Sequence, residues 1–269
     1  MLNSSSSHEP ILVFDQFVLR ADESDATVVI SSPWNWWLNP GDRLSVITSN
    51  SFLGYQLMAT LSDLVKPVAG EMLPQGTLSW PLGGQGGLHS SLTIDNGFEF
   101  LSSIYSDSLE KSLVSQEEFF DALKSQLIDL STPLKQLQKD KKDFFFAALS
   151  ILFSFDICIA PDSRYVMYLM SPGEATRILR NLFRKQIDGG LCMISTSSNM
   201  QFNREYCNRG IVLSPLGDVI FDGDLEEAIA LSNQNNIIGN GSEVNDKQFD
   251  FGEAMTNSDS HQSDDDIDF

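Results

Sequence analysis

The spacing of hydrophobic residues changes several times along the chain and separates strand-like from helix-like segments. Short apolar runs bounded by turn residues predict strands at 11–20, 27–31, 44–47, 155–160 and 191–196. The last two runs carry few polar side chains, which is typical of parallel strands with both faces buried. The first two are separated by acidic residues and predict an antiparallel pair at the start of the fold.

Apolar residues three and four positions apart predict helices between these strands. The expected helices are 57–65, one that begins at 91–93, helical segments over 113–138, a buried helix from 144, an amphipathic helix over 171–187 and a short helix over 225–231. Ser171 and Pro172 suit the N-cap and first position of the amphipathic helix. Because strands and helices alternate, the sequence predicts an α/β fold with a mainly parallel sheet flanked by helices.

A strand, a polar loop expected over 48–54 and a helix follow one another in GDRLSVITSNSFLGYQL, residues 41–57. This order is typical of a phosphate-binding P-loop. A working P-loop reads GxxxxGK[ST]: its backbone N–H groups hold phosphate, its lysine offsets phosphate charge and its hydroxyl holds Mg²⁺. The corresponding positions in this chain are Thr48, Ser49, Asn50, Ser51, Phe52, Leu53, Gly54, Tyr55 and Gln56. None of them is a lysine.

Composition narrows the class of protein. With 269 residues, of which 42% are hydrophobic, the chain can bury a core in one large domain or two small ones. Its longest apolar stretch, 144–160, is interrupted by Asp156 and is too short to span a bilayer, and the first ten residues do not read as a signal peptide. Three distant cysteines favour reduced thiols over disulfides or zinc. The net charge of −20 argues against nucleic acid as a partner.

Much of the negative charge lies at the end of the chain. Residues 240–269 contain nine acidic residues and one lysine, so 232–269 are expected to form a disordered acidic tail. Its simplest role is to solubilise the protein, and a docking motif is the alternative. The run Asp264-Asp265-Asp266 has no fixed cage around it, and no metal site is predicted. Residues 1–10 are also expected to be disordered, which leaves 11–231 as the folded domain.

Two aromatic segments are candidates for contacts. Residues 33–38, PWNWWL, hold three of the four tryptophans. This cluster could stack on an adenine ring, although such clusters more often cap a sheet edge or meet a partner. Glycines at five of the positions 76–87 predict a loop that approaches another chain closely. Trp80 in this loop is either core or a partner contact, and the contact is favoured because the glycines would leave its ring unshielded.

Six segments carry a family likeness in order and at matching spacing. They are PGDRLSVITSN, KPVAGEM, GTLSWPLGGQGGLHSSLT followed by FEFLSSIY, ALSILFSFD, PGEATRILRNLFRK and REYCNRGIVLSPLGDVIFDG. Over roughly 11–231 the chain thereby resembles the nucleotide-binding subunit of ABC transporters, in particular the branch that exports capsular polysaccharide. The resemblance implies a P-loop NTPase-like fold with an N-terminal antiparallel β part and a helical subdomain at about 92–150.

By this resemblance, the phosphate-binding loop has lost its chemistry. Its lysine falls on Gly54 and its hydroxyl pair on Tyr55 and Gln56, whereas Asn50 keeps the expected residue type. Loss of the lysine removes a charge-assisted contact worth about 1.5–3 kcal/mol. The Tyr55 ring would lie near the Mg²⁺ position.

The other catalytic motifs of the family are replaced as well. The metal-binding aspartate and the catalytic glutamate fall on Pro161 and Asp162, the signature on Lys139-Asp140-Lys141, and the switch histidine near Ser198. Pro161 cannot hold a metal-bound water. Asp162 is the weak candidate for a residual general base, and a turn or helix-capping role is the alternative. Together the changes predict no competent ATP hydrolysis by this chain alone and no catalytic residue.

The resemblance also implies which surface is retained. The expected coupling residues are Trp80, Pro81, Leu82, Gly83 and His89, and packing is expected for His89 rather than metal ligation. The expected protein is a structural or regulatory subunit on the cytoplasmic face of the cell membrane. Its partners would be a membrane-spanning exporter subunit and another ABC ATPase chain, in a homo- or heterodimer. No cofactor is expected, and Mg-ATP would bind only if the altered loop still holds it. The alternatives are a soluble interaction module on the same fold and a divergent active ATPase.

Overall fold

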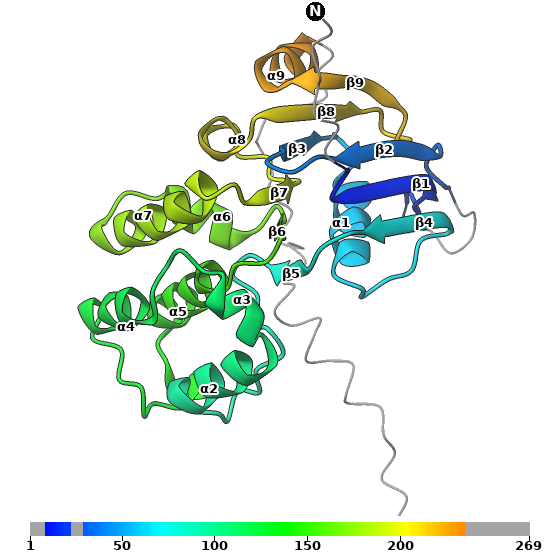
Figure 1. The fold of residues 1–269 in the computed structure, drawn as a ribbon. Helices are drawn as coiled ribbons and strands as arrows, with labels where there is room; N and C mark the ends of the chain where they lie inside the picture. Colours follow the sequence, from blue (N-terminus) through cyan, green and yellow to red (C-terminus); the bar gives the residue numbers. More distant parts are fainter. Residues whose placement is uncertain (1–8, 23–28, 235–269) are drawn as a thin grey trace, which may run out of the picture.

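Two sheets organise the molecule in residues 9–22 and 29–234, which are the residues that this computed structural model describes (Figure 1). The larger sheet has the strand order β5-β6-β7-β3-β8-β9, and the smaller has the order β2-β1-β4. The strands are β1 Leu12–Val18, β2 Trp34–Leu38, β3 Arg43–Ile47, β4 Ala69–Pro74, β5 Leu78–Pro81, β6 Ile157–Ala160, β7 Cys192–Ser195, β8 Arg209–Leu213 and β9 Val219–Asp224. Neighbours in the larger sheet run parallel from β5 to β8, and β9 is antiparallel to β8. The predicted α/β class is confirmed.

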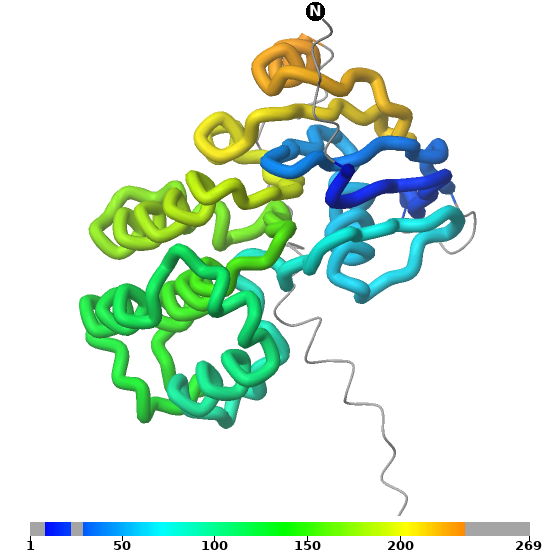
Figure 2. Tube along the Cα trace, in the orientation of Figure 1, coloured from blue at the N-terminus to red at the C-terminus, as the bar shows by residue number. Residues whose placement is uncertain are grey.

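Helices cover both faces of the large sheet. They are α1 Ser51–Leu61, α2 Ile94–Ile104, α3 Ser106–Glu110, α4 Gln116–Ser125, a 3₁₀ turn Leu134–Gln136, α5 Lys139–Leu152, α6 Arg164–Met170, α7 Glu174–Asp188, α8 Met200–Tyr206 and α9 Leu225–Gln234. Figure 2 shows that the green stretch with α2 to α5 extends away from the blue N-terminal sheet. These helices lie between β5 and β6 in the chain, where helical segments were expected.

The large sheet separates two hydrophobic cores. Side chains of successive strand residues point to opposite faces, and Cys158 and Met193 therefore belong to the core under α5 and α7, where Phe144, Phe145 and Phe146 are buried. Ile159 and Ile194 belong to the core that α1 and the small sheet cover. The large sheet is thus buried on both faces, which explains the uniformly apolar runs of β6 and β7.

The N-terminal sheet differs from the prediction. β1 pairs antiparallel with β2 on one side and with β4 on the other. The expected pairing with 27–31 is wrong as a strand pair, because both edges of β1 are already taken. What remains of it is an isolated bridge between Arg20 and Ile30, and residues 27 and 28 lie outside the described ranges.

The tryptophan segment forms β2 itself. Trp34 and Trp36 are buried against Phe14 and Phe17, whereas Trp37 is half exposed. Because β2 is an edge strand, the tryptophan cluster caps a sheet edge. This agrees with the alternative that such clusters more often cap a sheet edge than stack on an adenine ring. Its two buried rings are core residues.

Several helix boundaries were predicted wrongly. α1 begins at Ser51 rather than at 57 and ends at Leu61 rather than at 65. The helix expected from Ser171 is two helices, since Ser171 follows the end of α6 and Gly173 is the N-cap of α7. Thr176 holds this junction, because its hydroxyl donates to the carbonyls of Ser171 and Gly173. The expected start of the acidic tail at 232 lies inside α9, and 235–269 lie outside the described residues.

Candidate functional site

The carboxyl ends of three parallel strands meet at one edge of the large sheet. Thr48 follows β3, Pro161 follows β6 and Thr196 follows β7. The N–H of Asp162 donates to Oγ1 of Thr196 at 3.3 Å. A Cβ atom placed on Gly54 would lie 3.7 Å from Cβ of Thr196 and 3.8 Å from Cγ2 of Thr48. The fold therefore brings the predicted loop positions and Asp162 to the same edge.

Asn50 closes the loop after β3. It is the N-cap of α1, and its Oδ1 accepts a hydrogen bond from the N–H of Leu53 at 3.0 Å. The N–H of Gly54 donates to the Asn50 carbonyl at 3.2 Å, and the N–H of Asn50 donates to Oγ1 of Thr48 at 3.1 Å. Because an N-cap starts a helix at the next residue, the expected loop over 48–54 shortens to 48–50. The N–H groups of Asn50, Leu53 and Gly54 are bonded within the chain.

The other end of the Asn50 side chain ties this loop to two distant segments. Its Nδ2 donates to the carbonyl of Ala21 at 2.7 Å and to that of Pro215 at 2.8 Å. The turn that contains Pro215 is itself held, because Nε1 of Trp34 donates to the Gly217 carbonyl at 2.7 Å. The loop is thereby fixed between the N-terminal sheet and the turn that joins β8 to β9.

The remaining loop positions divide between core and surface. Leu53 is fully buried in the core beneath the small sheet, and Gln56 is also buried. Ser51 is exposed, and the rings of Phe52 and Tyr55, both partly exposed, lie 6.4 Å apart.

Asp162 lies between a strand and a helix. It is exposed and directly precedes Ser163, the N-cap of α6. This placement agrees with the turn alternative. Nearby, Arg164 pairs with the buried Asp143 of α5 at 3.2 Å and so connects α6 to α5. Within the ranges 9–22 and 29–234, no group of three or more His, Cys, Asp or Glu side chains could hold a metal ion.

Trp80 is a core residue, and the expectation that its ring is unshielded is wrong. It is 8% exposed and lies 5.1–5.6 Å from the rings of Tyr105, Phe153 and Phe155. Its Nε1 donates to Oγ of Ser150 at 3.0 Å. The glycines do not expose the ring because Trp80 is part of a strand, β5, and is covered by rings from the segments that directly follow α2 and α5. β5 was not predicted from the sequence, whereas β6, the strand that runs parallel to it, was.

The other expected coupling residues lie around this ring. Pro81, Leu82 and Gly83 are buried, whereas His89 is exposed and its Nδ1 lies 2.7 Å from Oγ of Ser91. Gly83 packs closely against α6, because a Cβ atom there would lie 2.1 Å from Cγ of Tyr165. Of these five residues, His89 is the one that a partner could reach.

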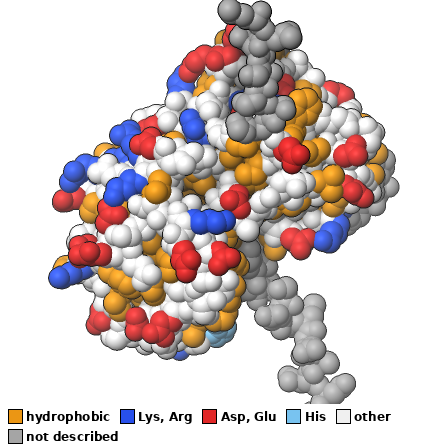
Figure 3. Space-filling view, viewed as in Figure 1, with side chains coloured by type: hydrophobic (Ala, Val, Ile, Leu, Met, Phe, Trp, Pro, Cys, Tyr) orange, Lys and Arg blue, Asp and Glu red, His pale blue; other side chains and the backbone are white. Residues whose placement is uncertain are grey.

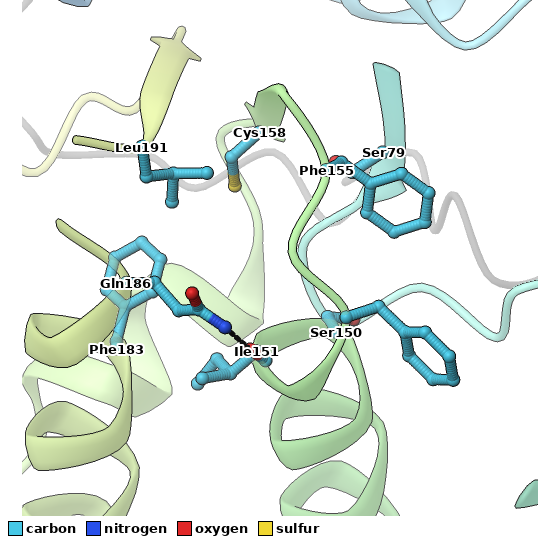
Figure 4. A pocket seen from close by; sticks show the side chains of 9 residues that line it. Ser79, Ser150, Ile151, Phe155, Cys158, Phe183, Gln186 and Leu191 are labelled. Carbon is cyan, nitrogen blue, oxygen red and sulfur yellow. Dashed lines mark hydrogen bonds between the residues drawn. The ribbon is translucent and has the colours of Figure 1, made fainter. Parts of the chain in front are cut away.

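A small internal cavity lies between β5, β6, α5 and α7 (Figure 4). It measures about 10 Å³, room for about one water molecule. Gln186 lines it and donates to the carbonyl of Ile151 and to Oγ of Ser112, both at 2.9 Å. Burial raises the pKa of the neighbouring Cys158 thiol to about 12, so this side chain is an uncharged core residue at neutral pH. The cavity is too small for a nucleotide.

Curated proteins similar to this chain come from capsule export. The capsule polysaccharide export ATP-binding protein CtrD of Neisseria meningitidis serogroup B is 26% identical over 65% of this chain and 77% of its own length. The polysialic acid transport ATP-binding protein KpsT of Escherichia coli is 25% identical over 71% of this chain and 84% of its own. No protein-family model matches the chain.

Solved structures agree with these relatives at the level of the fold. An ATP-binding subunit of an ABC transporter has a TM-score of 0.61 and 16% identity over 85% of this chain and 95% of its own. The ATP-binding cassette MJ0796, a dimer bound to ADP and Pi in a post-hydrolysis state, has a TM-score of 0.56 and 14% identity over 80% and 98%. This chain has the ABC ATPase fold, and its curated homologues are capsule polysaccharide export ATP-binding proteins. The resemblance inferred from the sequence is confirmed.

Within 9–22 and 29–234, no helix combines the length and the hydropathy that a bilayer crossing requires.

Proposed function

We propose that this chain is an ABC ATPase-like subunit of a polysaccharide export system that does not hydrolyse ATP on its own. It acts as a structural or regulatory partner of the transporter. The capsule-export relatives support a role in polysaccharide export, and the ABC ATPase fold supports a subunit of the ATP-binding type.

The observation that carries the non-hydrolysing part is the Asn50 cap. A P-loop holds phosphate with backbone N–H groups that point into the loop. Here the N–H of Leu53 and that of Gly54 are bonded to Asn50, and α1 starts at Ser51. Gly54 supplies no cation, and neither Tyr55 nor Gln56 supplies the serine or threonine hydroxyl that holds Mg²⁺. These residues do not fit Mg-ATP.

The proposed location is the cytoplasmic face of the membrane, peripheral and beside a membrane-spanning exporter subunit. In this arrangement the chain pairs with itself or with a competent ATP-binding chain, as MJ0796 pairs in its dimer. The segment from β5 to α2 is proposed as the coupling surface. Its buried residues Trp80 and Gly83 position the loop, and its exposed residue His89 meets the partner.

Calorimetric titration of Mg-ATP into the purified chain tests the proposal, with phosphate release followed on the same sample. We expect neither millimolar binding nor release. The matched variant is Asp162→Asn. Phosphate release that this substitution abolishes would show a divergent active ATPase and would contradict the proposal.

The partner requires a separate experiment. The chain is co-expressed with the membrane-spanning subunit of its own exporter, and the membranes are washed at low and high salt. Retention of the chain that is lost in the His89→Glu variant supports the coupling surface. A chain that remains free of membranes and of any ABC ATPase would instead be a soluble interaction module on this fold.

A further inference from the structure

Leu127 combines exposure with an unfavourable backbone conformation. Leu127 follows α4, is 82% exposed and has a φ angle of +52°. Left-handed backbone is costly for a leucine because Cβ approaches the carbonyl oxygen. The conformation closes the end of α4, because the N–H of Leu127 donates to the Lys124 carbonyl at 2.9 Å and the N–H of Ile128 donates to the Leu123 carbonyl at 3.1 Å. The backbone is thereby accounted for, and the leucine side chain is left exposed for a further contact.

Four lysines follow this residue within fifteen positions of the chain. Within 135–142 the chain has Lys135, Lys139, Lys141 and Lys142 against a single acidic residue, Asp140. Lys139, Lys141 and Lys142 lie in the first turn of α5, where cations oppose the helix dipole. Lys141 joins the two features, because its Nζ donates to the Leu127 carbonyl at 2.6 Å. Leu127 and these lysines are called the lysine patch below.

The lysine patch differs from the other basic surface of the molecule. Basic side chains on α7 and α8 gather at the left of Figure 3. There Arg184 pairs with Glu205 at 2.7 Å and Arg204 with Glu226 at 3.0 Å. The four lysines of the patch form no ion pair with an acidic side chain in the described residues, and Lys142 lies over the Phe146 ring at 5.9 Å. Their charge is uncompensated in a protein whose net charge is −20.

The end of the chain has the complementary chemistry. Residues 243–269 contain all nine acidic residues of the stretch after Gln234, and they end in DDDIDF, where acidic and apolar side chains alternate. A segment of this composition complements an exposed leucine and the four lysines that follow it, one of which contacts the leucine carbonyl. It is also long enough, since thirty extended residues reach about 100 Å and a domain of this length is roughly 45 Å across.

We propose that residues 243–269 dock on the lysine patch of the same chain. Acidic side chains of DDDIDF pair with the lysines, and Ile267 or Phe269 covers Leu127. The tail is then an intramolecular ligand of the α4–α5 junction rather than a solubilising appendage alone.

Hydrogen exchange on the full chain tests the docking. Deletion of 243–269 removes none of the described residues, and we expect it to increase amide exchange over 126–142 several-fold. The exchange of β3 and β7 should not change. Equal exchange over 126–142 in the two proteins would overturn the proposal.

Binding in trans identifies the contact chemistry. A labelled peptide of residues 243–269 should bind the shortened chain, and its affinity should fall at least about tenfold when Lys135, Lys139, Lys141 and Lys142 are changed to Gln or when salt is raised. The control changes Lys66, Arg177, Arg184 and Arg204 to Gln, because these side chains already have acidic partners. A peptide that does not bind, or that responds equally to both sets of changes, contradicts the proposal.

The Leu127→Gly variant separates docking from folding. Glycine accepts a positive φ angle, so the shortened chain should unfold at a higher temperature with this change, whereas peptide affinity should fall. A Leu127→Gly variant that binds the peptide as tightly as the unchanged shortened chain would contradict the proposed contact between Leu127 and the tail. Exchange protection that increases with protein concentration would place the tail on a second copy and would refute docking within one chain.

Discussion

Asn50 accepts a hydrogen bond from the N–H of Leu53 at 3.0 Å, and this bond closes the turn in which a P-loop would hold phosphate. The same geometry recurs at α8, where Asn199 accepts from the N–H of Phe202 at 3.0 Å. Asn50 differs in that its Nδ2 also bonds the carbonyls of Ala21 and Pro215. The cap of α1 is therefore also a connection between three parts of the fold.

We expect Asn50→Ala to lower the free energy of unfolding by about 2–4 kcal/mol. The lost cap accounts for about 0.5–2 kcal/mol, and each of the two carbonyl bonds for about 1 kcal/mol. Urea denaturation measures the change. Asn199→Ala is the control and should cost only the cap. Equal losses for the two variants would mean that the links to Ala21 and Pro215 contribute nothing.

Gly54→Ala should stabilise the protein by about 0.5–1 kcal/mol. Gly54 lies inside α1, where alanine is the better helix former. The new Cβ would meet Thr48 and Thr196 at ordinary contact distances of 3.7–3.8 Å. Thermal unfolding followed by circular dichroism tests this expectation. A lower unfolding temperature would mean that the edge formed by Thr48 and Thr196 has no room for the methyl group.

Gly83→Ala should have the opposite effect and cost about 3 kcal/mol or more. Its φ angle is +78°, and the new Cβ would lie 2.1 Å from the Tyr165 ring, so both strain and overlap arise. Gly87→Ala is the matched control. Gly87 has a φ angle of +81°, but its new Cβ would have no atom within 4 Å, so strain alone, about 1–2 kcal/mol, is expected. Similar losses in denaturant titrations of both variants would refute the close packing of Gly83 on α6.

The cysteines predict a loss of stability at alkaline pH. Burial raises the pKa of Cys158 and that of Cys207 from 9.0 to about 12. A raised folded-state pKa contributes stability that is complete below pH 9 and is lost as the pH rises toward 12. We expect the urea midpoint to fall over this window, and to fall less in the Cys158→Ala and Cys207→Ala double variant. Rapid reaction of either thiol with a disulfide reagent in the native protein at pH 8 would contradict this burial.

Much of the large sheet could be predicted because its strands are buried on both faces. The segments that form β6 and β7 are short apolar runs, so each could be identified as a buried strand without knowing which strand it pairs with. β5 was missed because four residues beside a glycine-rich loop carry too little periodicity. The pairing of β1 was missed for a different reason: register in a sheet depends on which distant strand arrives, and β4 lies some fifty residues away.

The candidate site was predicted in its position but not in its geometry. Strand order places Thr48, Gly54 and Asp162 at one edge, as the motif spacing indicated. The predicted loop is too long because Asn50 is the N-cap of α1, so the helix begins directly after it. The motif shows only that an asparagine is expected at this position of the family and does not show that it caps a helix. The placement of Trp80 was wrong because the rings that cover it, Tyr105, Phe153 and Phe155, come from segments that local sequence does not connect to it.

The strand order also fixes when each part can form during synthesis. The small sheet needs only residues 12–74, so its pairing partners leave the ribosome early. β3 lies in the centre of the large sheet, and Leu44 pairs with Ile194 on one side and Arg209 on the other. This central strand must wait for more than 140 further residues, about 7–30 s at ordinary translation rates. Until then, the apolar residues of 43–47 have neither of their sheet partners in the nascent chain.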